Sequence, residues 1–180
     1  MNSQSIEQIA EIQTSAPGGR INSRSEALAA RLESGAKALA SFAATLSEAE
    51  WQTPLHRDGR TIGEVVRQVA GIFSVEIHVA SLLAAGQPIT GLTGDSVDTM
   101  NRNSAKENNG VTKQDTLALL AENSAAAARA IRAFTDEELD RSVPASFNRG
   151  APVTCQFILE ELEHAVRHSY LHLSRMWAAR

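Results

Sequence analysis

The chain has 180 residues, which is the length of one domain built around a single core. It is 43% hydrophobic and 21% charged, a balance that excludes collagen-like, disordered and membrane-spanning classes for the chain as a whole. The net charge is −4 and the basic residues are scattered, so no electrostatic footprint for nucleic acid is present. Alanine, the best helix former, occurs 29 times and makes helix the first expectation.

The amino-terminal residues have the pattern of a separate arm. Three isoleucines form a short apolar stripe: Ile6, Ile9 and Ile12. Pro17 and the two glycines after it then break the chain. The stretch has no basic or apolar segment of the kind that marks a secretory signal, and the single cysteine, Cys155, fits a reducing compartment. We therefore expect an arm over residues 1–20, a bundle domain over 21–180 and a cytoplasmic protein that does not bind a membrane.

Four long segments have apolar residues at spacings of three and four, which is the pattern of one buried helix face. They run from Ser23 to about Leu46, from Thr61 to about Ala85, from Thr112 to about Phe134, and from about Thr154 to Ala178. Capping-box sequences also predict short helices after Ser47 and Thr135. Residues 89–111 are expected to form a long polar loop and residues 142–152 a linker, without strands. The predicted fold is all-α: a four-helix bundle with an amino-terminal arm.

Three of the five histidines lie on the last predicted helix, at His164, His168 and His172, each four residues from the next. Residues at i and i+4 lie on one face of a helix, so two of these imidazoles can converge on one metal ion. Glu161 extends the same stripe. His56 and His78, on a loop and on the second long helix, are expected to have no such role.

The histidine spacing can be tested against two known kinds of metal helix. A zinc-protease helix needs H-E-x-x-H, and neither histidine pair has that glutamate. A ferritin-like di-iron bundle needs two Glu-x-x-His motifs, and Glu161 to His164 supplies one with no second. Two interpretations remain: a mononuclear site with a third ligand from another helix, or a polar seam packed against backbone and water, which spacing alone favours.

Several short motifs, taken in their order and separation, resemble the DinB/YfiT-like superfamily over about residues 25–178. They are Trp51, the entry Asp58-Gly59-Arg60-Thr61-Ile62-Gly63-Glu64-Val65, the exit Ala84-Ala85-Gly86-Gln87-Pro88, and His168-Ser169-Tyr170-Leu171-His172 with Leu173, Ser174 and Arg175 after it. The resemblance implies a four-helix bundle with a three-histidine site for a divalent metal. Members include transferases and isomerases that use low-molecular-weight thiols such as mycothiol or bacillithiol.

The resemblance implies that His168 and His172 are two of the three metal ligands. The first family histidine, seven residues after the threonine that opens the second long helix, falls on Gln68. An amide oxygen is a poor ligand for zinc or nickel compared with an imidazole nitrogen, so we expect the metal to be weakly bound or absent. His164 is an alternative ligand. No evident replacement for the missing imidazole is found among His164, Glu161 and Glu76, which lies eight residues after Gln68.

Two functions stay open at this stage. The first is a metal-dependent, thiol-dependent transferase or hydrolase that acts on a small molecule, with a degenerate metal site at Gln68. The second is a metal-free bundle that binds a small ligand or a partner without catalysis. Gln68, in place of a histidine ligand, favours this second function. Cys155 is expected to be a small buried side chain rather than a nucleophile, because no histidine is adjacent to it in sequence. The alanine-rich third helix and the arm predict a homodimer.

Overall fold

The computed structural model describes residues 23–55, 60–93, 112–160 and the single positions 96, 99 and 177. Its helices are α1 (Ser23–Thr45), α2 (Glu48–Trp51), α3 (Ile62–Ala84), α5 (Lys113–Arg132), α6 (Asp136–Asp140) and α7 (Cys155–Glu160), with strands β1 (Ser142–Pro144) and β2 (Pro152–Thr154). The predicted arm over residues 1–20, most of the predicted polar loop and most of the last predicted helix lie outside the described residues.

The helices begin where local sequence signals predict. Thr61 caps α3: its Oγ1 accepts from the Glu64 backbone N–H at 3.1 Å, and the Glu64 carboxylate accepts from the Thr61 N–H at 2.7 Å. Ser47 and Thr135 cap α2 and α6 through the same reciprocal pair of bonds. Each box satisfies backbone N–H groups that the first turn of a helix leaves without a partner. The predicted capping boxes are therefore confirmed.

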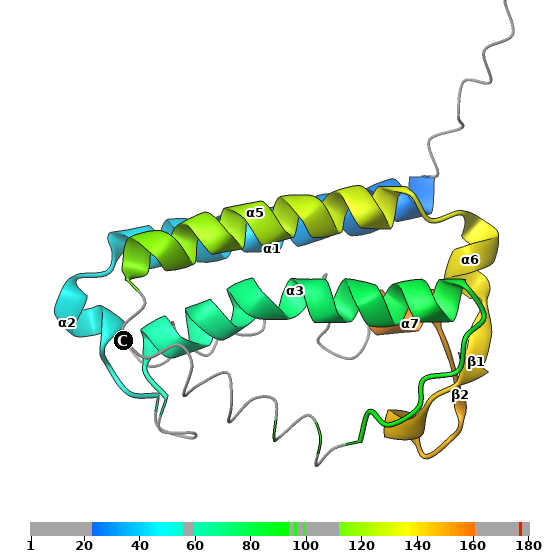
Figure 1. Ribbon diagram of the computed structural model, residues 1–180. Helices are drawn as coiled ribbons and strands as arrows, with labels where there is room; N and C mark the ends of the chain where they lie inside the picture. Colours follow the sequence, from blue (N-terminus) through cyan, green and yellow to red (C-terminus); the bar gives the residue numbers. More distant parts are fainter. Residues whose placement is uncertain are drawn as a thin grey trace, which may run out of the picture.

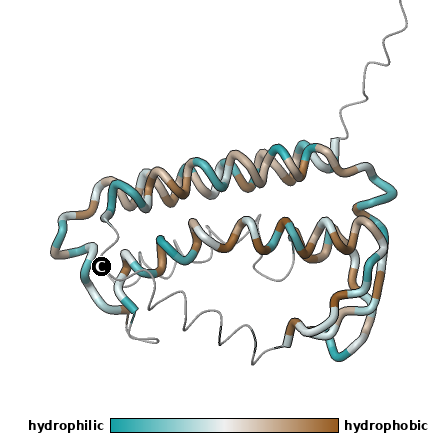
Figure 2. The backbone as a smooth tube through the Cα atoms, in the orientation of Figure 1, coloured by the Kyte–Doolittle hydropathy of each residue, from teal (hydrophilic) through white to brown (hydrophobic). Residues whose placement is uncertain are grey.

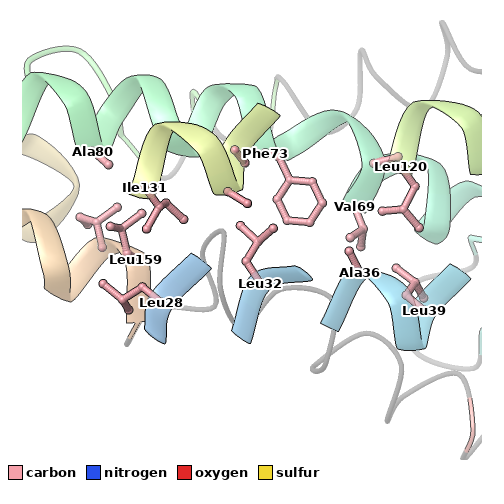
Figure 3. Packing of buried hydrophobic residues seen from close by; sticks show 14 of the residues in the cluster. Leu28, Leu32, Ala36, Leu39, Val69, Phe73, Ala80, Leu120, Ile131 and Leu159 are labelled. Carbon is pink, nitrogen blue, oxygen red and sulfur yellow. The ribbon is translucent and has the colours of Figure 1, made fainter. Parts of the chain in front are cut away.

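One core is formed between the helices. Figure 2 shows apolar positions recurring along α1, α3 and α5 with hydrophilic positions between them. In Figure 3, side chains from four helices meet: Leu32 from α1, Phe73 from α3, Ile131 from α5 and Leu159 from α7, each fully buried. Burying a side chain of this size contributes about 1.5–3 kcal/mol, so this shared core is the main source of the fold's stability.

The directions of the helices follow from contacts at their ends. Arg132, at the end of α5, binds Glu26 near the start of α1, whereas the Lys113 ammonium at the start of α5 donates to the Leu46 carbonyl at 2.6 Å. α5 is therefore antiparallel to α1, and Figure 1 shows α3 running parallel to α5. Because parallel neighbours begin at the same end, the connection from α3 to α5 has to return the length of the bundle, about 30 Å. This requirement explains the long segment between them.

The segment expected to be a linker contains a small antiparallel sheet, so that expectation was wrong. Val143 pairs with Val153, and the paired ends are Pro144 and Pro152. Strands of three residues are too short to show a period of two in the sequence, and proline at a strand end indicates a break rather than a strand. The hairpin also holds the exit of α3, because the Ile89 N–H donates to the Pro144 carbonyl at 3.1 Å.

Among the described helices, α3 alone is long and apolar enough to cross a membrane by length and composition. The core helix of a soluble protein passes the same test, and α3 packs against α5 and α7 with Phe73 and Val69 fully buried. The composition of α3 is thus accounted for by its place in the core.

Candidate functional site

The amino-terminal end of α3 is held by a close contact with α2. Trp51 is 4% exposed, and its indole lies directly over the backbone of Gly63, in the first turn of α3. A β-bridge between Pro54 and Thr61 closes the intervening chain, and the Leu55 N–H donates to the Arg60 carbonyl at 2.8 Å. The backbone of Arg60 is thereby fixed beside the first turns of α3.

Gln68, the position predicted as the degenerate third ligand, is half-buried two turns into α3. Its side-chain oxygen accepts a hydrogen bond from Nη1 of Arg60, which is also half-buried. A guanidinium has five donors and no acceptor and stays charged at any physiological pH. The amide oxygen that stands at the predicted ligand position is therefore bound to a fixed positive charge.

Glu76 is the other polar residue of α3 that the sequence singled out, and the structure buries it to 4% exposure. Eight residues separate it from Gln68, about 12 Å along the helix axis. Metal–ligand bonds are about 2 Å long, so Gln68 and Glu76 do not by themselves converge on one ion. Nor does the described part of the chain contain a group of three or more His, Cys, Asp or Glu residues that could hold a metal.

The histidines are distributed unevenly between the described and remaining parts of the chain. His168, His172, the alternative ligand His164 and Glu161 all lie outside the described residues, so their predicted roles stay predictions. His56 lies outside them too, whereas His78 is exposed on α3. Of the three predicted ligand positions, Gln68, His168 and His172, the structure thus describes Gln68. It also shows that Arg60 donates a hydrogen bond to Gln68.

Cys155 begins α7 and is fully buried. Burial first, and the nearby Glu138 carboxylate second, raise the pKa of its thiol to about 12. A thiol in such surroundings is protonated and shielded, which is the state of an inert core residue rather than a nucleophile. The prediction that Cys155 is a small buried side chain is confirmed.

The sequence did not reveal the role of Arg60, although Arg60 lies in the motif that leads into α3. It precedes the helix that carries Gln68, so no helical spacing relates the two residues. The bridge from Pro54 to Thr61 and the hydrogen bond from Leu55 N–H fix the backbone of Arg60 next to the start of α3. A cationic residue directly before a capping threonine was the only local signal.

Comparison with known proteins gives one family. A model of the DinB superfamily matches residues 31–176. No curated protein matches the sequence at a significant level.

Three solved structures share the fold at low sequence identity. YfiT from Bacillus subtilis, described as a probable metal-dependent hydrolase with an unusual four-helix bundle topology, has a TM-score of 0.69 and 18% identity over 92% of this chain and 91% of its own. A mycothiol-dependent maleylpyruvate isomerase has a TM-score of 0.63 and 12% identity, with 84% of this chain and 60% of that one covered. A DinB-like protein from Bacillus subtilis has a TM-score of 0.54 and 14% identity, over 85% and 89% of the two chains. The predicted all-α four-helix bundle is confirmed.

Proposed function

The chain belongs to the DinB superfamily, and on that premise we propose that it binds a small molecule at the end of the bundle where α3 begins, through a degenerate form of the family's metal site. The observation that carries the proposal is the hydrogen bond from Arg60 to Gln68. Gln68 and Arg60, the described residues there, do not fit a divalent metal, because a neutral amide oxygen is a weak ligand and this one accepts a hydrogen bond from a cation. Repulsion between a guanidinium and a divalent ion a few Å apart amounts to several kcal/mol near a protein surface.

Two contacts with α1 position Gln156 and Trp177. Arg24 donates to the Gln156 side chain at 3.1 Å, and the rings of Phe42 and Trp177 lie 5.1 Å apart. The stretch of α1 between Arg24 and Phe42 is about 27 Å long, so Gln156 and Trp177 contact α1 near its opposite ends.

The sequence predicts one helix from about Thr154 to Ala178, and that prediction puts His168 and His172 on the same helix. Trp177 contacts Phe42 near the end of α1, and this is also the end at which α3 begins. Gln68 lies two turns into α3, whereas His168 and His172 lie outside the described residues. The proposal takes His168 and His172 to this end of the bundle from the family resemblance, which implies that they form one site with Gln68.

A second candidate function is a metal-dependent hydrolase or thiol-dependent transferase acting on a small molecule. Two of the similar structures favour it, one described as metal-dependent and the other as mycothiol-dependent. In that case His168 and His172 would hold the metal with His164 or a bound thiol as a further ligand, and the metal would lower the pKa of a bound thiol or water. Arg60 would then have to leave Gln68 when the metal binds.

Metal analysis separates the two candidates. We expect protein purified without a histidine tag and dialysed without chelator to hold well under one divalent ion per chain. Stoichiometric zinc or nickel in that preparation would overturn the metal-free proposal and support the second candidate.

A substitution then tests the site itself. Gln68→His should tighten zinc or nickel binding at least tenfold, about 1.4 kcal/mol, measured by competition with a chelator. The same change in a His168→Ala background should tighten metal binding much less. Gln52→His makes the same replacement at an exposed position directly after α2 and should leave metal affinity unchanged. Equal affinity in the parent and the Gln68→His variant would show that Gln68, His168 and His172 do not form one site.

A further inference from the structure

The outward face of α5 carries a continuous stripe of small and charged residues. All are exposed and lie on one side of the helix: Ala118, Glu122, Ala125, Ala126, Arg129 and Ala133, which we call the α5 stripe. Beside it, a groove of ≈ 250 Å³ between α1 and α5 is lined by small side chains such as Ala36, Ala40 and Ala121. Alanine at these positions lets another helix approach closely, to about 8 Å between axes.

The two charges of the α5 stripe differ from the other charges of this helix. Lys113 binds a backbone carbonyl of the α1 end, Asp115 binds the capping threonine, and Arg132 binds two carboxylates of α1. Glu122 and Arg129 take part in no ion pair or side-chain hydrogen bond among the described residues. They are seven residues apart, about 10 Å, which is well beyond the spacing at which residues of one helix pair.

The α5 stripe is complementary to itself. Its midpoint lies between Ala125 and Ala126, with Glu122 and Arg129 equally far on either side and alanine at both outer positions, Ala118 and Ala133. A two-fold axis through that midpoint sets α5 of one protomer antiparallel to α5 of the other. Each glutamate then faces the partner's arginine, and each alanine faces an alanine.

We propose that the α5 stripe is the interface of a homodimer, in which two α5 helices pack antiparallel and Glu122 and Arg129 form two reciprocal ion pairs between protomers. The inference concerns a face of the bundle separate from the Gln68 site and does not depend on the proposed function. α5 has 20 residues and is about 30 Å long, so a strip about 10 Å wide covers roughly 300 Å² on each protomer. Stable interfaces bury about 1,200 Å² or more in total, so the dimer is weak and forms in the micromolar range or above.

Charge reversal tests the interface directly. Glu122→Arg places two cations on each stripe and Arg129→Glu places two carboxylates, so each variant alone faces its own copy with like charges. An equimolar mixture of the two variants restores opposite charges at both contacts. Sedimentation equilibrium from 20 to 500 µM in 50 mM salt should show the parent dimerising, each variant weakened at least tenfold, and the mixture associating about as well as the parent.

The double variant Glu122→Arg with Arg129→Glu should also recover dimerisation, and 0.5 M salt should weaken the parent dimer because exposed ion pairs are screened. Ser74→Arg, on the exposed side of α3, is the matched control and should leave the association unchanged. Circular dichroism should show every variant folded, since all these positions are exposed. A parent that stays monomeric at 500 µM, or a dimer that the single reversals do not weaken, would overturn the proposal.

Discussion

The contact between Trp51 and Gly63 makes a sharp prediction about stability. A methyl group added at Gly63 meets the Trp51 indole, with its carbon 2.5 Å from Cε2 and 2.9 Å from Cδ1, whereas a methyl group at Gly71 in the same helix meets nothing within 4 Å. Trp51 is 4% exposed and packed in the core, so the indole cannot swing away without a cavity opening elsewhere. The same substitution at two glycines of α3 should therefore have opposite effects.

The magnitudes follow from two competing effects. Alanine is about 0.8–1 kcal/mol better than glycine inside a helix, a gain that both variants share. Forcing an extra carbon into a packed core costs about 1–3 kcal/mol, which only Gly63→Ala incurs, at the upper end for so short a contact. We expect Gly63→Ala to lower the free energy of unfolding by about 1–2 kcal/mol, and Gly71→Ala to raise it by about 0.5–1 kcal/mol.

Urea unfolding followed by circular dichroism measures both changes, and Tm should fall by a few degrees in the first variant and rise in the second. A variant without the indole provides the control. In a Trp51→Leu background, Gly63→Ala should lower the free energy of unfolding much less. If both alanine variants change stability in the same direction and by similar amounts, the reasoning from the indole contact is refuted.

Two further predictions concern ionisable groups. Arg132 lowers the pKa values of Glu26 and Glu33 through its hydrogen bonds, so the stability that these carboxylates contribute is present above their unfolded pKa of about 4.5 and is lost as the pH falls through their lower folded values. Arg132→Met should therefore make unfolding less sensitive to acid below pH 4.5, and a urea series that gives identical pH slopes for both proteins would contradict this. Cys155, with a pKa of about 12, should react with iodoacetamide at pH 8 about a thousandfold more slowly in the native than in the urea-unfolded protein, and labelling at equal rates would show that the thiol is accessible.

The parts of the fold that could be predicted from the sequence are those that depend on neighbouring residues. The capping box of Thr61 and Glu64 and the stop at Gly86, which adopts φ 74°, are local signals, and the structure uses both. The β1–β2 hairpin was missed because its pairing depends on contacts across a turn rather than on any repeat within strands of three residues. Helix direction was not predicted either, since periodicity shows which face is buried but not which neighbour buries it.

In the candidate site, too, the sequence predicted the residue that depends on local spacing and missed the one that depends on a contact between segments. Gln68 could be singled out because its distance from Thr61 along one helix is fixed. Its partner Arg60 could not, because that contact depends on how the chain folds back before α3. His168 and His172 stay predictions, which rest on their spacing and on the family resemblance.

The hydrogen bond between Arg60 and Gln68 depends on the residue at position 68 being an amide rather than an imidazole. An imidazole that binds a divalent ion with one nitrogen offers only an N–H on the other, so it cannot accept a hydrogen bond from a guanidinium. The side-chain carbonyl of Gln68 has an acceptor oxygen instead, and this oxygen accepts a hydrogen bond from the Arg60 guanidinium. Where the family resemblance implies an imidazole ligand, this chain therefore has an acceptor that binds a cationic side chain. The site has one positive charge on a side chain, where the family resemblance implies two on a metal. We therefore propose that it favours a small ligand with an acceptor or anionic group over one that needs a Lewis acid.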